Sequence, residues 1–171
     1  SPRGPLPGNG SLVAALTAAT AAQPESVGKP EPTLYAAALT DLDPANALAV
    51  GDRLDTDIAG ARTAGVASLL VLTGVSGPRD LLRAAPGDRP QFIGRDLRAL
   101  FAEHHPATFA GGVGRCGSAV ARPTAGRIEI DQPSAGADRL DGLRALCALA
   151  WGSAGPGRAA ELAPYDSVLG E

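Results

Sequence analysis

The sequence predicts an α/β fold, a doubly wound parallel sheet with helices on both faces, over residues 27–105. Two apolar runs carry this prediction, "ALAV" at 47–50 and "ASLLVLTG" at 67–74. Neither run alternates with polar residues, which is typical of strands buried on both faces of a parallel sheet. Helical patterns lie between and after these runs, and such alternation is typical of βαβ units.

The residues before the first apolar run predict two helices. The stretch "NGSLVAALTAATAA", 9–22, has Asn9 or Ser11 as its capping residue and an apolar stripe of Leu12, Ala15, Leu16 and Ala19. The second helix, 31–39, has prolines near its first turn, where proline is tolerated. Between the two helices, Glu25 to Val27 is a candidate for a short strand.

The remaining elements follow in order along the chain. "TDIAGARTAG", 56–65, predicts a helix that Gly65 closes, and "PRDLLRAA", 78–85, predicts another. "PQFIGRDLRALFAEH", 90–104, predicts a short strand followed by a helix. Residues 106–171 are rich in Gly, Ala and Pro over their first half, and they predict a C-terminal extension with the character of a small α/β domain. This extension contains a half-exposed strand at 127–131 and an amphipathic helix at 137–152 that packs on the core or on a partner.

Composition excludes several classes of protein. The net charge of -3 and the pI of about 5.4 argue against nucleic acid as a partner, because such surfaces need clustered Lys and Arg. No apolar run approaches the roughly 20 residues of a membrane span, and no signal peptide is visible. The two cysteines, Cys116 and Cys147, favour free thiols in a reducing cytosol over a disulfide, so we expect a cytoplasmic protein.

The start of the chain is unusual for a translation product. The 171 residues contain no Met and open with "SPRGPLPGNG". A Pro/Gly-rich opening that leads straight into a helix resembles a cut edge. We therefore expect this chain to be the C-terminal part of a longer protein.

Two carboxylates, Asp52 and Asp57, follow the first apolar strand in "VGDRLDTDIAGARTAG", 50–65. The carboxyl ends of parallel strands are where ligands bind in open α/β sheets. Gly51 allows a close backbone approach there, or an unusual φ. Carboxylates without His or Cys nearby favour a hard cation, so the pair is a candidate Mg²⁺ site. In the alternative interpretation, Asp55 or Thr56 caps the next helix and Asp57 complements its dipole.

Lys29 strengthens the metal interpretation. It is the only Lys in the chain and lies in "GKPEP", at another strand-to-helix junction. If the preceding strand is parallel to 47–50, Lys29 lies at the same edge of the sheet as Asp52. A lysine at that edge is a point charge for a phosphate, although an ordinary solvated lysine remains the alternative.

The two motifs together, "GKPEP" and "GDRLDTDI", resemble those of the haloacid dehalogenase (HAD) superfamily of phosphatases, in its NagD-like, p-nitrophenylphosphatase-like branch. Lys29 matches the third motif of that family, and Asp52 and Asp57 match the fourth. "TGVSG", 73–77, resembles the usual continuation. The resemblance covers about residues 5–101, with 1–26 as the end of a cap domain and its return to the core. The family's nucleophile motif, D-x-D-G-T, does not occur in this chain.

The resemblance implies an Mg²⁺-dependent phosphatase for a small phosphomonoester, of the sugar or glycerol phosphate type. An aspartate in the missing N-terminal part of the same protein would form an aspartyl-phosphate, and this fragment alone would be inactive. Asp52 would bind Mg²⁺ directly, Asp57 through water, and Lys29 would neutralise charge on the phosphoryl group. A homodimer is one further expected partner arrangement.

Two alternatives belong to other classes of protein. One is a non-catalytic structural or regulatory half-domain whose tail helix docks a partner. The other is a receiver-like phosphorylation module, but in receivers the lysine follows the aspartates, and here it precedes them.

Overall fold

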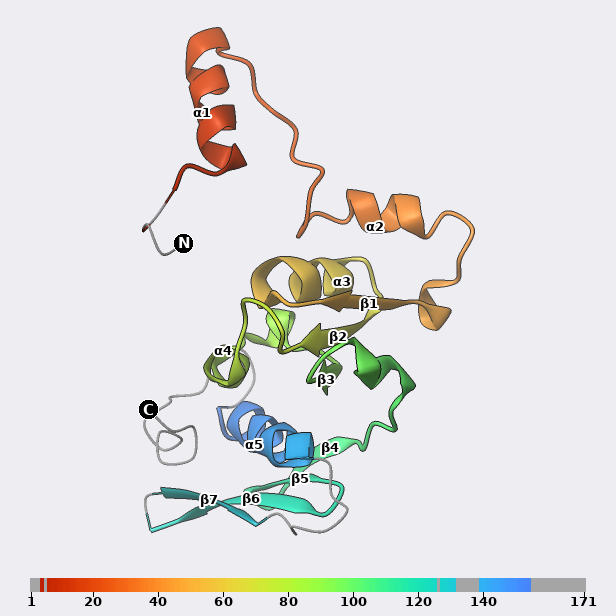
Figure 1. The fold of residues 1–171 in the computed structure, drawn as a ribbon, viewed down its shortest axis with the longest axis vertical. Helices are drawn as coiled ribbons and strands as arrows, with labels where there is room; N and C mark the ends of the chain where they lie inside the picture. The colour runs from red at the N-terminus through yellow and green to blue at the C-terminus, as the bar shows by residue number, and fades with distance from the viewer. Residues whose placement is uncertain (1–3, 5, 126, 132–138, 155–171) are drawn as a thin grey trace.

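The protein consists of a parallel α/β unit followed by an antiparallel unit, with helix α5 between their sheets (Figure 1). The computed structural model describes residues 4, 6–125, 127–131 and 139–154. None of the helices in these ranges has the length and apolar character needed to cross a membrane.

The first sheet is parallel, in the order β1-β2-β3, as the apolar runs predict. Its strands are β1 (Leu48–Gly51), β2 (Ala67–Val71) and β3 (Phe92–Gly94). The central strand β2 contributes Leu69 and Leu70 to the core, exposed by only 1% and 0%. The connecting helices are α3 (Ala59–Thr63) and α4 (Pro78–Arg83). Gly65 follows α3 with φ +71°, a left-handed conformation typical of a residue that closes a helix.

Short helical turns complete this unit. Leu54–Ile58 forms a π-helical turn that runs directly into α3, and three 3₁₀ turns occur at Pro44–Asn46, Pro86–Asp88 and Leu97–Phe101. The last of these replaces the helix expected after β3. The π-helical turn is the one that carries Asp57, and such turns occur often at functional sites.

Strand β1 is more exposed than its apolar sequence predicts. Leu48 and Val50 are 40% and 36% exposed, so the expectation of burial on both faces is wrong for this strand. Among the described residues, β1 is hydrogen-bonded to β2 on one side and to no strand on the other. Strand β1 is therefore an apolar edge strand of the described sheet and not a strand buried on both faces.

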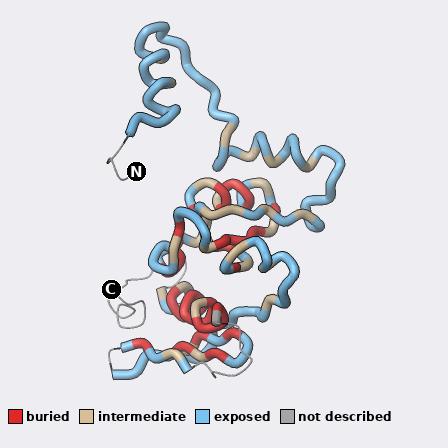
Figure 2. The backbone as a smooth tube through the Cα atoms, in the orientation of Figure 1, coloured by how far each residue is buried: buried red, intermediate tan, exposed pale blue. Residues whose placement is uncertain are grey.

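The N-terminal helices contribute nothing to the core. Helix α1 (Asn9–Thr20) lies well away from the sheet, and neither it nor α2 (Thr33–Ala38) has a buried residue (Figures 1 and 2). Two expectations are wrong here. Gly8 is the N-cap of α1, with no capping side chain in place of Asn9 or Ser11, and 25–27 forms no strand. The apolar stripe predicted on α1 faces solvent.

The second unit is an antiparallel sheet in the order β4-β5-β6-β7. Its strands are β4 (Ala107–Ala110), β5 (Val113–Cys116), β6 (Ala119–Thr124) and β7 (Arg127–Asp131), followed by α5 (Arg139–Ser153). Only β7 and α5 were expected from the sequence. The sequence predicts no element for residues 107–124, which are rich in Gly, Ala and Pro, yet they contain the strands β4, β5 and β6. This unit is therefore antiparallel and not a continuation of the α/β pattern.

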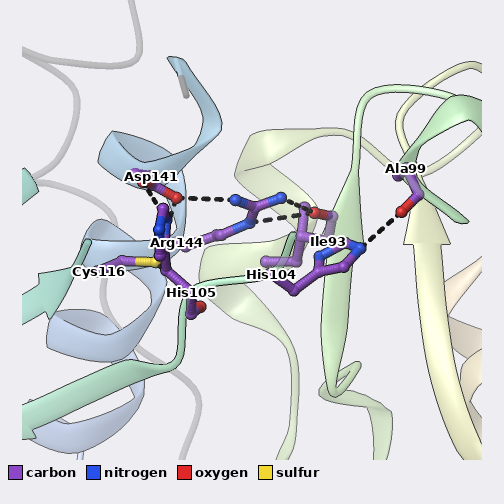
Figure 3. Close-up of polar contacts among 7 residues, drawn as sticks. All are labelled: Ile93, Ala99, His104, His105, Cys116, Asp141 and Arg144. Atoms are coloured by element: carbon purple, nitrogen blue, oxygen red, sulfur yellow. Dashed lines mark hydrogen bonds and ion pairs between the residues drawn. The ribbon is translucent and has the colours of Figure 1, made fainter. Parts of the chain in front are cut away.

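A buried polar network joins the two units (Figure 3). Asp141 of α5 is 1% exposed and accepts hydrogen bonds from Arg144 Nη1 at 2.8 Å and Cys116 Sγ at 3.4 Å. His105 Nδ1 lies 2.9 Å from the other oxygen of the same carboxylate. Arg144 also donates twice to the Ile93 carbonyl of β3, at 3.1 and 2.7 Å. The guanidinium thus ties α5 to the backbone of β3, which among the described residues is the edge strand opposite β1.

Helix α5 packs on elements of both units. It contacts β4, β5 and β6 on one side and α4 and β3 on the other. Trp151 Nε1 donates to the Leu81 carbonyl of α4 at 2.8 Å. Cys116 and Cys147 form no disulfide, as expected, and both thiols are buried. Because most of α5 is buried within the chain, it has no broad face left for the partner considered in the half-domain alternative.

Candidate active site

Lys29 and Asp57 form an ion pair at the carboxyl end of β1. Lys29 Nζ lies 2.5 Å from Asp57 Oδ1, across 28 positions of sequence. The lysine side chain is 48% exposed, whereas the carboxylate is 9% exposed. The structure thus brings together Lys29 and the acidic motif, which the sequence could only place at one edge of the sheet.

The Asp57 carboxylate is fully engaged by this chain. Its second oxygen, Oδ2, accepts the backbone N–H groups of Asp52 and Arg53 at 3.2 and 3.1 Å. Gly51 has to be glycine because a Cβ at that position would overlap the Asp57 side chain. The close approach expected at Gly51 is therefore present, and its partner is Asp57.

Asp52 is held differently, through a single oxygen. Its Oδ2 accepts the Val75 N–H at 2.9 Å, and its backbone carbonyl accepts the Ser76 N–H, also at 2.9 Å. No described residue donates to Asp52 Oδ1. One carboxylate oxygen at the carboxyl end of β1 is thus available to a ligand.

The capping part of the alternative interpretation is wrong, because no side chain caps the turn Leu54–Ile58 or α3. Asp55 accepts from Arg53 Nε and Nη2, at 3.0 and 2.6 Å, and caps no helix. Asp57 does lie in the first turn of the helical segment, where a dipole role would put it, and its carboxylate also bonds to Lys29 and to two backbone amides.

The electrostatics of the pair favour a permanently charged lysine. The hydrogen bond from Lys29 to Asp57 raises the pKa of the ammonium above its usual 10.5, against a smaller opposing effect of burial. Burial raises the pKa of Tyr35, whose hydroxyl donates to the Asp57 carbonyl at 2.9 Å. At neutral pH the site therefore carries a cationic lysine beside a neutral phenol.

Three contributors to the site were not expected from the sequence. Tyr35 was assigned only to a helix, and the "TGVSG" stretch was noted as a continuation with no role for Val75 or Ser76. Two of these contacts use backbone N–H groups, which every residue but proline carries. Side-chain spacing holds no signal for them.

The described residues do not complete a metal site by themselves. They contain no group of three or more His, Cys, Asp or Glu side chains placed to hold one ion. Among the described residues, Asp52 Oδ1 has no donor, whereas both carboxylate oxygens of Asp57 accept hydrogen bonds.

The chain thus carries a lysine-paired acidic motif at the carboxyl end of a strand in a parallel sheet. Residues 26–100 match the family model described as HAD-hydrolase-like. The chain thus contains an HAD-like hydrolase domain, as the two motifs predict.

Known relatives belong to the phosphatase branch of that family. The D-glycerol 3-phosphate phosphatase of Mycobacterium tuberculosis is 56% identical over 98 residues, which are 57% of this chain and 28% of the relative. The dihydroxyacetone phosphatase of Corynebacterium glutamicum is 39% identical over 48% of this chain and 31% of its own length.

Solved structures agree with this assignment. The M. tuberculosis glycerol phosphate phosphatase, solved in complex with magnesium, has a TM-score of 0.70 and 38% identity. The match covers 99% of this chain and 50% of that one. The p-nitrophenyl phosphatase of Archaeoglobus fulgidus has a TM-score of 0.50 and 31% identity, over 58% of this chain and 40% of its own. This chain spans half or less of each of these relatives.

The C-terminal unit has a likeness of its own. Residues 116–171 match a family model described as a GCN5-related N-acetyltransferase like domain. The described part of that range comprises β6, β7 and α5, with the last residue of β5.

Proposed function

We propose that this chain supplies the metal-binding and charge-neutralising part of an Mg²⁺-dependent phosphatase active site. The observation that carries the proposal is the Lys29–Asp57 ion pair beside Asp52, at the carboxyl end of β1. An ordinary solvated lysine would not be held at 2.5 Å from a nearly buried carboxylate.

The donor set fits magnesium. Asp52 offers a carboxylate oxygen, and Mg²⁺ is commonly held by one or two protein carboxylates with phosphate and water. Asp57 has no oxygen free of hydrogen bonds, so we assign it to orienting the shell around the ion through Asp52 and through water. Bound magnesium would polarise the phosphoryl oxygens and balance their charge.

The reaction we propose is hydrolysis through a covalent intermediate. A carboxylate oxygen of an aspartate outside these 171 residues bonds to phosphorus, and the ester P–O bond breaks. The leaving oxygen takes a proton from solvent and departs as the alcohol, and a water molecule then cleaves the acyl phosphate to release phosphate and regenerate the carboxylate. Lys29 neutralises negative charge on the phosphoryl group. Removing one such electrostatic contact costs roughly 3–4 kcal/mol in comparable sites.

The open edge of β1 supports a nucleophile from outside the described structure. That edge lies beside Lys29 and Asp57, and Leu48 and Val50 are exposed there. A hollow of about 250 Å³ opens at the same place, between α2 and β1. We propose that a segment upstream of residue 1 covers this edge and brings the nucleophile. Residues 1–26 then end the cap, 27–105 form the core, and 106–171 form the extension.

The substrate class follows from the relatives. Two of them are named as phosphatases after three-carbon compounds, D-glycerol 3-phosphate in one and dihydroxyacetone in the other. We propose a small phosphomonoester of the sugar or glycerol phosphate type as the substrate and the cytoplasm as the location. The residues that would choose among such substrates lie outside the described sheet.

The test is a pair of activity measurements with p-nitrophenyl phosphate and glycerol 3-phosphate. We expect the 171-residue chain alone to turn over neither. In the protein that includes the upstream segment, we expect Mg²⁺-dependent turnover that Asp52→Asn abolishes. A variant that keeps more than about a tenth of the rate would contradict the metal-binding role of Asp52.

A further inference from the structure

The loop after β2 holds the Asp52 carboxylate in one orientation. This loop, residues 72–77, runs from β2 to α4 and passes the end of β1. Its Val75 N–H donates to Asp52 Oδ2, and its Ser76 N–H donates to the Asp52 carbonyl, both at 2.9 Å. Asp52 is thus bound through its side chain and its main chain by consecutive residues of one loop.

Ser76 anchors the loop on the far side of Asp52. Its Oγ accepts the Leu54 N–H at 3.1 Å, and the residue is 9% exposed. Leu54 begins the π-helical turn that carries Asp57. Ser76 is therefore bonded to the backbone of both Asp52 and Leu54, so the loop cannot shift without moving one of these two residues.

Gly74 allows the carboxylate to lie where it does. A Cβ at position 74 would overlap the Asp52 carboxylate, and its distance to Asp52 Cβ would be 2.6 Å. Gly74 has an ordinary backbone conformation, because its φ lies outside the left-handed range. The demand for glycine here is steric, made by the carboxylate and not by the turn.

From these contacts we infer that Gly74 and Ser76 are positioning residues for the metal ligand Asp52. The loop occupies Oδ2 with a backbone N–H and leaves Oδ1 as the oxygen that faces the ion. This inference rests on the proposed function, since it assumes that Asp52 binds the cation. It adds that the orientation of the ligand is set by the loop after the next strand, 22 or more positions away in sequence.

The experiment measures Mn²⁺ binding in the protein that includes the upstream segment, by the electron paramagnetic resonance signal of the free ion. We expect Gly74→Ala to weaken binding about 10- to 100-fold, the usual range for loss of an orienting contact. We expect Ser76→Ala to weaken it about 2- to 10-fold, as for loss of one hydrogen bond. Gly77→Ala is the matched control, because a methyl there meets only Asp80 Oδ2, at 3.9 Å.

Stability is measured in parallel, so that a loss of binding is not confused with unfolding. Each variant is unfolded in urea, with the tryptophan fluorescence of the protein as the signal. If Gly74→Ala and Ser76→Ala bind Mn²⁺ within a factor of two of the unmodified protein while Asp52→Asn does not, the positioning role is wrong and the metal site stands. If Asp52→Asn binds as tightly as the unmodified protein, the proposed function itself fails.

Discussion

Replacement of Asp141 by alanine tests the buried network that joins the two units. The carboxylate is 1% exposed and is the acidic partner of Arg144, which is itself 5% exposed. Removing one partner of a buried ion pair typically costs about 3–5 kcal/mol. Arg144 keeps its two hydrogen bonds to the Ile93 carbonyl in the variant, so the change measures the loss of the carboxylate.

The assay is urea unfolding of the 171-residue chain, followed by fluorescence. Trp151 is the only tryptophan and bonds to the Leu81 carbonyl across the junction, so its emission reports on the contact between α5 and α4. For a denaturant slope of about 2 kcal/mol per M, a loss of 3–5 kcal/mol lowers the midpoint by about 1.5–2.5 M.

Asp131→Asn is the matched control in the same unit. Asp131 pairs with Arg122 at 3.5 Å, and the two side chains are 68% and 48% exposed. Such a surface pair contributes at most about 1 kcal/mol, so its loss shifts the midpoint by about 0.5 M or less. If Asp141→Ala shifted the midpoint no further than this control, the network would not stabilise the junction and the reasoning would be refuted.

Three further predictions concern charges and thiols. The pKa of Lys29 is raised above 10.5 in the folded chain, so its pairing with Asp57 stabilises the fold fully below pH 10.5 and stops doing so as the pH rises through the raised value. Between pH 9 and 12, the urea midpoint of Lys29→Met should therefore fall less than that of the unmodified chain. Arg98 lowers the pKa of Asp96 from 3.8 to about 2, so this exposed pair stabilises above pH 3.8 and is lost as the pH falls towards 2; Asp96→Asn should flatten that part of the profile slightly. Burial raises the pKa of the Cys147 thiol, so iodoacetamide should label it only in urea, as mass spectrometry would show.

Each of these predictions has an outcome that contradicts it. Identical alkaline profiles for Lys29→Met and the unmodified chain would mean that the ion pair adds no stability. An acid profile that Asp96→Asn leaves unchanged would exclude its pairing with Arg98 as a source of pH dependence. Rapid labelling of Cys147 in the native chain would mean that α5 leaves the sheet often enough to expose it.

The parallel sheet was predictable because its signal is local. Continuous apolar runs such as 67–71 have few other interpretations when glycines and helical patterns flank them. The strands β4, β5 and β6 were missed because they consist largely of small residues. Segments such as "VGRC" and "ATFA" become strands through pairing with one another and through packing against α5, which no short window of sequence records.

The acidic motif likewise was predictable in its position but not in the hydrogen bonds of its carboxylates. Sequence spacing placed Asp52 and Asp57 at the carboxyl end of β1, because ligand-binding residues follow parallel strands. It placed Lys29 beside them through a strand at 25–27 that does not form, so the position was right and its reason was wrong. Sequence spacing could not show which of the two carboxylates has both oxygens hydrogen-bonded and which has one oxygen without a donor. This difference depends on backbone N–H groups at residues 52, 53 and 75, and these become donors to a particular oxygen only once the turns are formed.

The difference between the two carboxylates also explains why like charges are crowded after β1. Two bare carboxylates would repel each other, but Asp57 is neutralised by Lys29 and two amides inside the chain, whereas Asp52 keeps one oxygen without a donor among the described residues. A single cation at Asp52 is then enough to balance the charge that remains. If Lys29→Met strengthened Mn²⁺ binding, as a second unpaired carboxylate would, Asp57 would be able to bind the ion directly once the lysine is removed. If Lys29→Met weakened Mn²⁺ binding, Lys29 would be needed to hold Asp57 where its carboxylate accepts the backbone N–H of Asp52.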